Sequence, residues 1–529
     1  MRISIRFLAA AAVVSLAGAV AACSSAATTG IGSARSSGQP VHGGTLKVAL
    51  YSDIQNINPI TSEDPVAQLM WGNWWQYAVY ATPNGQSLQP MLATSWSITS
   101  DYKTYTFQIR PGVEFSDGEA LTAEDVAWSW EYMISQSAAQ MNFLAPRIAS
   151  ITAPGPLTVR VVFKTPYPYF LDDVSGFEAV IMPKALVEKE GWSAYLRHPV
   201  GTGPFVLTSW QRGASIQVTR NPHYWQHGLP YLDGITYLVM PDDQSRITAV
   251  ESGTADVATQ IPYNEVRSLS SRPGMYVANF PQSIDWNMVL NTLDPPLNNV
   301  LVRRAISLAI NRAELEQAAL YGNGVAAKTF LPDPAGLTFA DPALNLYPYD
   351  PAKAKALLAQ AGVRNLHLTL LLEPGQAEAA TGAVIQADLA AVGIHLSLDT
   401  VSETSWLDDL TSQKFQLTTS FWQDISPNPI NQIQYTMVPD YAAGCCKAFW
   451  SSLNDPAVIA AAQAATTAVG SHAALQPIFN KAQIAEAQAA DPLPLYNDVT
   501  TPTLMSSRVH GFAENPYDGA YFAGIWLAS

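Results

Sequence analysis

Histidine and cysteine are the residue types in this chain that could support metal or nucleophilic chemistry. His223 and His227 are four residues apart, which could place two imidazoles on one helix face, but they lie in a turn-like run without a third ligand. Cys445 and Cys446 are adjacent, with no histidine nearby, and form either two free thiols or a strained disulfide. No nucleophile-elbow pattern stands out, so we expect no enzyme activity, no cofactor and no metal site.

The third cysteine, Cys23, ends a motif of a different kind. A basic start and an apolar run, Phe7 to Val20, precede Val20-Ala21-Ala22-Cys23, which looks like a bacterial lipobox. We expect residues 1–22 to be a lipoprotein signal peptide and Cys23 to carry the lipid. Residues 23–42 are rich in Ser, Gly, Ala and Thr and should form a flexible tether. The alternative is an ordinary signal peptide in which Cys23 is incidental.

The composition narrows the choice of partners. The formal net charge is −15, and an acidic surface argues against nucleic acid and against an anionic membrane face. Aromatic residues reach 10% and include 14 tryptophans. Most of these rings should fill the core, but a ligand cleft would also use them, because such rings stack on flat or apolar ligand groups.

Residues 91–130 carry the strongest local pattern. Tyr105, Phe107 and Ile109 alternate with polar residues, which predicts a half-buried strand. Turn residues follow, and Thr122 then stands three residues before Asp125, the spacing of a helix capping box. This order predicts a strand, a hairpin and a capped helix.

The same stretch resembles the extracytoplasmic solute-binding proteins of the peptide/nickel ABC-importer family. The resemblance continues in blocks to about residue 500. The blocks that carry it are Leu92-Ala93-x-x-Trp96, Tyr105-Thr106-Phe107, Arg110 to Val113, Phe115 to Gly118, Leu121 to Val126, Gly201 to Phe205, Arg220 to Trp225, Ser252 to Val257, the helix after Asn299 and the helix after Asp350. We interpret Gly201 to Phe205 as a tight turn, because it lacks the ending of a phosphate loop. Arg303 and Arg304 are expected to make surface or inter-helix contacts.

The resemblance implies an α/β, two-lobed periplasmic-binding-protein-like fold of the cluster C type, with mixed sheets, a hinge and an extra inserted domain. Lobe I would comprise residues 43–80, 200–285 and 499–529, the inserted domain 81–199, and lobe II 286–498. Strands at 366–372 and 394–398 flank a helix at 383–392, which predicts a mixed, largely parallel sheet.

The ligand residues are also implied by the resemblance. Peptide-binding relatives carry Trp-x-x-Asp-x-x-x-Pro, whose Asp receives the ligand's ammonium group. If Trp422 and Pro429 are aligned with that motif, Ile425 takes the place of the Asp and Asp424 comes one residue early, on the other strand face. A local bulge that restores Asp424 is the alternative. Further candidates are, by family position, Tyr51, Ser52, Asp53 and Asn323.

We therefore expect a lipid-anchored receptor on the extracytoplasmic face of the cell membrane, monomeric, which captures a small solute by hinge closure. The solute is expected to be a short peptide, with a metal chelate or a saccharide as alternatives. Its partners would be an ABC permease and ATPase complex. A non-transport lipoprotein that acts as a sensor or scaffold in cell-envelope synthesis, and a secreted hydrolase, are the competing classes.

Overall fold

The computed structural model describes residues 38–60, 65–82, 87–136, 141–176, 179–331, 339–423, 429–438, 454–515, 519–520 and 522–528. The chain divides into two units, Met1–Ile31 and Gly32–Ser529, and the first unit lies wholly outside these residues. Cys23, Asp424, Ile425, Cys445 and Cys446 also lie outside the described residues. In the part of the chain that is described, no helix has the length and apolarity needed to cross a membrane.

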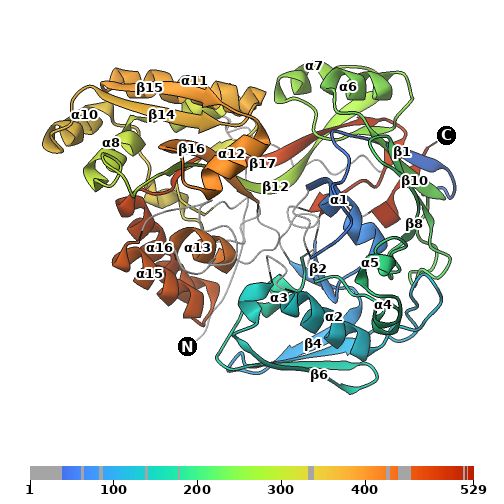
Figure 1. Cartoon of the computed structure of the whole chain (residues 1–529). Coiled ribbons are helices and arrows are strands. Elements are labelled where there is room, and N and C mark those ends of the chain that lie inside the picture. Colours follow the sequence, from blue (N-terminus) through green and yellow to red (C-terminus); the bar gives the residue numbers. More distant parts are fainter. Residues whose placement is uncertain are drawn as a thin grey trace, which may run out of the picture. The chain divides into compact units, whose positions relative to one another are not determined.

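The largest sheet has eleven strands within the described residues (Figure 1). Their order is β15 (Ile394–Thr400), β14 (Leu366–Leu372), β16 (Leu417–Gln423), β12 (Met275–Leu290), β17 (Leu493–Ser506), β11 (Val257–Ala258), β1 (Thr45–Leu50), β10 (Gly234–Val239), β9 (Ser215–Arg220) and β8 (Phe205–Gln211), with β13 (Val325–Ala326) paired to β17. The long strands β12 and β17 lie in the middle and join the half of the sheet that contains β14 to the half that contains β1.

The sheet is mixed, which confirms the predicted fold class. Strand β14 is parallel to β15 and β16, and β1 is parallel to β10 and β11. The expectation of a largely parallel sheet was wrong, because β12 is antiparallel to β16 and β17, and β8, β9 and β10 pair as antiparallel neighbours. Local βαβ periodicity predicts parallel pairs only where a helix crosses between strands.

Helices flank both halves of this sheet. In the first part of the chain, α1 (Pro65–Trp74), α6 (Asp243–Glu251) and α7 (Val266–Leu269) contact strands of this sheet, and the other helices are α3 (Phe170–Asp173), α4 (Lys184–Glu190) and α5 (Trp192–Tyr195), of which α4 packs against α5. Those that follow β12 are α8 (Val300–Ala309), α9 (Arg312–Leu320), α10 (Pro351–Gln360), α11 (Gln376–Ala391), α12 (Glu403–Thr411), α13 (Pro429–Met437), α15 (Pro456–Thr467) and α16 (His472–Ala489).

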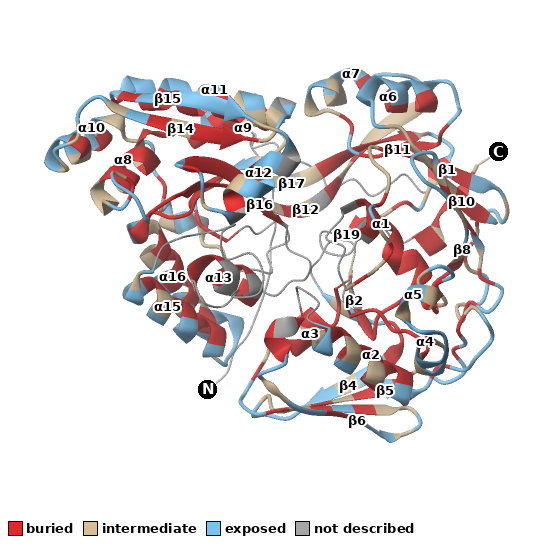
Figure 2. Ribbon diagram, in the orientation of Figure 1, coloured by how far each residue is buried: buried red, intermediate tan, exposed pale blue. Residues whose placement is uncertain are grey.

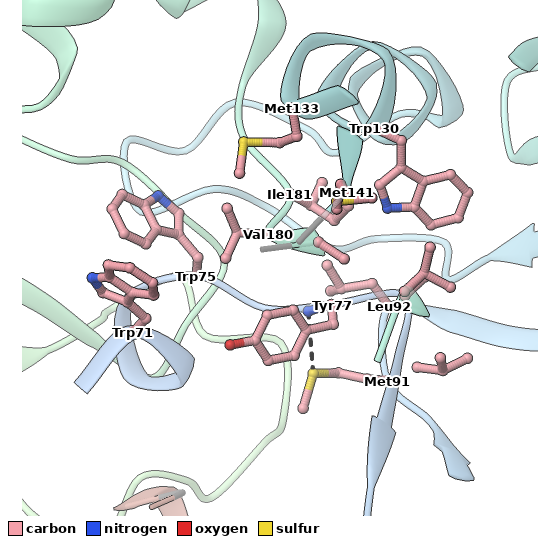
Figure 3. Close-up of a cluster of buried hydrophobic side chains, with 14 of the residues drawn as sticks. Trp71, Trp75, Tyr77, Met91, Leu92, Trp130, Met133, Met141, Val180 and Ile181 are labelled. Carbon is pink, nitrogen blue, oxygen red and sulfur yellow. Dashed lines mark hydrogen bonds between the residues drawn. The ribbon is translucent and has the colours of Figure 1, made fainter. Parts of the chain in front are cut away.

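A second sheet lies within residues 93–163 and has the order β4 (Ala93–Ile98), β5 (Thr104–Ile109), β7 (Thr158–Phe163) and β6 (Ile148–Gly155). Helix α2 (Ala123–Ser135) packs on it and leaves the other side exposed (Figure 2). Its Trp130 belongs to an aromatic and methionine-rich core with Trp71, Trp75 and Tyr77 (Figure 3). This core joins α1 and α2 into one packed body.

The local sequence signals of this region are confirmed. Tyr105, Phe107 and Ile109 are buried. Thr122 Oγ1 accepts a hydrogen bond from the Asp125 backbone N–H at 3.3 Å, and the Thr122 N–H donates to the Asp125 carboxylate at 2.9 Å, which completes the capping box. Two orphan donors of the first helical turn are thereby satisfied. The domain boundaries remain a prediction.

Side chains of β12 alternate between two faces of the large sheet. Met288 and Leu290 pack with residues of α8 to α11, whereas Val289 packs with Trp406 and Leu410 of α12. Because alternate strand residues share a face, even-numbered residues from position 284 onward lie on what we call the α11 face and odd-numbered residues on the α12 face.

Candidate functional site

Strands β12 and β17 position the candidate site, since they run from one half of the sheet to the other. Ile284 stands opposite Asp498, and Trp286 stands opposite both Tyr496 of β17 and Phe421 of β16. Directly paired residues share a face of the sheet. The register thus brings two aromatic rings and a carboxyl group beside Trp286 on the α11 face.

A cavity of about 510 Å³ lies over this part of the α11 face. Its aromatic lining residues are Tyr51, Tyr263, Trp286, Tyr321 and Phe421, and its acidic lining residues are Asp243, Glu378 and Asp498. None of the described lining residues is Lys, Arg or His. The cavity is therefore apolar and aromatic in its walls and negative in its charge.

Two aromatic rings of the cavity wall, those of Trp286 and Phe421, contact each other, and the Tyr496 ring supports Trp286 from below. The Trp286 ring centroid lies 5.2 Å from that of Phe421 and 5.9 Å from that of Tyr496, which stacks beneath it at an interplanar angle of 26°. Phe421 is 38% exposed and Tyr321 is 45% exposed, which is high for such side chains. Apolar rings exposed at a concave surface are typical of ligand sites.

Asp498 and Tyr263 form the most perturbed pair of the cavity. The Tyr263 hydroxyl contacts the Asp498 carboxyl group and also donates to the Thr500 carbonyl oxygen at 2.8 Å. Burial raises the pKa of Asp498 from 3.8 to about 7. Since a tyrosine has one hydroxyl proton, both contacts are satisfied when protonated Asp498 donates to Tyr263 and Tyr263 donates to Thr500.

Glu378 is the second desolvated carboxyl group in the cavity. It stands in the first turn of α11, and burial raises its pKa above 4.5. Asp243 differs, because its carboxylate is paired with Arg246 at 2.6 Å. Within the described residues, neither Glu378 nor Asp498 forms an ion pair with a basic side chain, and both would gain from a cation.

The α12 face of the same strands carries buried polar groups. Trp422, 6% exposed, stands opposite Asp285, which in turn stands opposite Asn497. The Asn287 side-chain amide donates to the Asp285 carboxylate, and both residues are buried. Sequence reasoning missed Asp285 and Asn287, although two polar residues at alternate positions of a hydrophobic strand were a readable signal.

The predicted ligand residues do not all come together. Tyr51 lines the cavity on the α11 face, whereas Trp422 lies on the α12 face, and its neighbour Phe421 contributes the cavity wall instead. Asp53 accepts hydrogen bonds from Trp210 Nε1 at 3.0 Å and from the Gly213 N–H at 2.8 Å, so its carboxylate links the loop after β1 to the β8–β9 hairpin.

Two other predicted residues have local surroundings that do not define a binding role. Ser52 is half-buried in the loop after β1. The Asn323 side chain donates to the Leu320 carbonyl oxygen at 2.8 Å, at the end of α9. The ligand-binding roles of all these residues, and those of Asp424 and Ile425, stay predictions.

The structure also accounts for His223, Gly203 and Arg303, to which the sequence analysis assigned no ligand-binding role. His223 Nδ1 lies 2.7 Å from a Glu114 carboxylate oxygen, and within the described residues no cluster of three or more potential metal ligands occurs. A side chain at Gly203 would collide with the backbone of Asn73. This close approach requires a glycine at position 203 whether or not the turn binds a phosphate. Arg303 donates to carbonyl oxygens of Ala489 and Leu297, an inter-element contact as predicted.

The arrangement of the sheet, with two strands joining its halves, is that of two-lobed periplasmic binding proteins. A periplasmic binding protein DppA from Helicobacter pylori, solved with the peptide STSA, is 24% identical, has a TM-score of 0.79, and is matched over 92% of this chain and 99% of its own. The Listeria monocytogenes substrate-binding protein CtaP is 19% identical with a TM-score of 0.81, over 92% and 100% of the two chains. These two likenesses define the fold.

The sequence comparisons identify the family. Residues 87–442 match the bacterial extracellular solute-binding proteins, family 5. The glutathione-binding protein GsiB of Shigella flexneri serotype 5b is 30% identical over 351 residues, which is 66% of this chain and 68% of the relative. The chain belongs to the bacterial extracellular solute-binding proteins of family 5, and it is a solute-binding protein of an ABC importer.

Proposed function

We propose that this protein is a lipid-anchored receptor that captures a short peptide and passes it to an ABC permease and ATPase complex, without catalysis. The observation that carries the proposal is the 30% identity to glutathione-binding relatives over two thirds of the chain, since glutathione is a tripeptide. The fold supports it, because β12 and β17 join the two halves of the sheet and can act as a hinge.

The solute site is proposed to lie on the α12 face, at the end of β16. Trp422 stands on this face one residue before the strand ends at Gln423, where the run with Asp424 and Ile425 follows. The buried Asp285 and Asn287 supply polar groups beside it. A carboxylate in such surroundings holds an ammonium or amide group strongly, because water does not compete.

Titration calorimetry with glutathione and with di-, tri- and tetrapeptides tests the solute class. We expect saturable binding of at least one short peptide, and a smaller radius of gyration in small-angle scattering when it is bound. Binding of metal chelates or saccharides, with none of the peptides bound, would contradict the peptide class. Saturation without contraction would contradict hinge closure.

Substitutions on neighbouring residues of β16 test the position of the solute. Trp422→Ala should weaken peptide binding by about tenfold or more, whereas the matched change Phe421→Ala on the α11 face should alter it little. Asp424→Asn should also have little effect, since we expect Ile425 to occupy the position of the family's Asp. A large loss for Asp424→Asn with little for Trp422→Ala would refute this assignment.

The anchor is proposed to be a lipid on Cys23. The support is the lipobox that Cys23 ends and the polar, glycine- and serine-rich run that follows it. The variant Cys23→Ser should move the protein from the membrane fraction to the extracellular or periplasmic fraction, with peptide binding unchanged. Retention in the membrane at the wild-type level would contradict the lipid anchor.

A further inference from the structure

The cavity on the α11 face lies across the sheet from the proposed peptide site. Consecutive strand residues point to opposite faces, so Phe421 lines this cavity while Trp422 points to the α12 face. The peptide site proposed above does not account for this cavity. Its volume of about 510 Å³ lies in the usual range of small-ligand pockets.

The walls of the cavity come from both halves of the sheet. Tyr51 and Tyr263 follow β1 and β11 in one half. Glu378 and Phe421 belong to α11 and β16 in the other half, with Trp286 between them on β12. An occupant would therefore contact residues of both halves of the sheet and the middle of the connecting strands.

The acidic groups and the aromatic rings of the cavity both favour a positively charged ligand. Glu378 and Asp498 are carboxyl groups that form no ion pair with a basic side chain in the described part of the chain, and no described lining residue carries a positive charge. The half-buried Trp286 and the 38% exposed Phe421 present ring faces beside them. Aromatic faces together with carboxylates attract an organic cation, because each ring has a negative face and each carboxylate a full charge.

We propose that this cavity is a second ligand site, which binds a small organic cation such as a quaternary ammonium compound between the Trp286 and Phe421 rings and the carboxylates of Glu378 and Asp498. An inorganic cation would not use the aromatic walls. A peptide carboxylate would be repelled by both acidic groups. The site is independent of the proposed peptide specificity.

The protonation of Asp498 gives the site a pH dependence. Burial raises the pKa of Asp498 to about 7, and the titratable groups around it are Tyr263, Tyr496 and Glu378. A cation binds the ionised carboxylate, so its affinity should rise between about pH 5 and about pH 8. Tyr263 and Tyr496 stay neutral over this range, because burial raises the pKa of each phenol.

The test uses choline as the probe and 3,3-dimethyl-1-butanol, its uncharged isostere, as the matched ligand control. Titration calorimetry of the ligand-free protein should show choline binding at least about tenfold tighter than the isostere at about pH 8, and weaker choline binding at about pH 5. Absence of choline binding at both pH values would overturn the proposal. Equal binding of the isostere would overturn the role of charge.

Two substitutions test whether choline binds in this cavity. Glu378→Gln should weaken choline binding by about tenfold while leaving peptide binding intact, and Trp422→Phe, on the α12 face, should leave choline binding unchanged. If Trp422→Phe weakens choline binding, or if a bound peptide displaces choline competitively, choline occupies the peptide site and the proposal is wrong. If no peptide binds but choline binds as described, the proposal stands and only the peptide specificity fails.

Discussion

Replacement of Asp498 by asparagine should stabilise the protein, by an amount that depends on pH. Burial raises the pKa of Asp498 from 3.8 to about 7. The folded protein therefore holds more protons than the unfolded chain between about pH 4 and about pH 7, so this carboxyl group makes the free energy of unfolding fall as the pH rises. Above about pH 7 the charged group costs about 4 kcal/mol.

Asparagine removes that cost and keeps a donor for the Tyr263 hydroxyl, since its amide can replace the protonated carboxyl group. We expect Asp498→Asn to raise the free energy of unfolding by about 2–4 kcal/mol at about pH 8 and by less than about 1 kcal/mol at about pH 4. Urea denaturation of the ligand-free protein, followed by circular dichroism at several pH values, measures the difference.

Asp294→Asn is the matched control, because the Asp294 side chain is exposed. This variant should unfold like the wild type at every pH. A stabilisation by Asp498→Asn that is the same at about pH 4 and about pH 8 would refute the titration argument. A loss of stability at about pH 8 would show that the ionised carboxylate is favoured where it stands.

Three further substitutions test local packing. Thr122→Ala removes the side-chain half of the α2 capping box and should cost about 1 kcal/mol in urea denaturation. Gly203→Ala should lower the denaturation midpoint strongly, because the new Cβ would lie 2.6 Å from the Asn73 carbonyl carbon, whereas Gly524→Ala meets open space and should have little effect. Arg303→Met should cost about 2–4 kcal/mol by leaving buried carbonyl groups without donors, whereas Arg304→Met, at a half-buried residue whose hydrogen bond to the Gln488 carbonyl oxygen is exposed, should cost less than about 1 kcal/mol.

The sequence was sufficient for features that depend on neighbouring residues. The strand at Tyr105 to Ile109, the capping box of Thr122 and Asp125, and the start of α10 at Pro351 with Asp350 as N-cap all follow from short-range spacing. The sequence blocks that resemble the family also predicted the two-lobed fold, because they follow one another in the order found in that fold.

Tertiary structure alone decided which face each site residue takes. Sequence alternation shows that Phe421 and Trp422 differ in face, but only the pairing of β16 with β12 places Phe421 beside Trp286 and Trp422 beside Asp285. The cavity joins Tyr51, Glu378 and Asp498, which are more than a hundred residues apart from one another. The raised pKa of Asp498 likewise depends on burial by distant segments, and no local pattern contains that information.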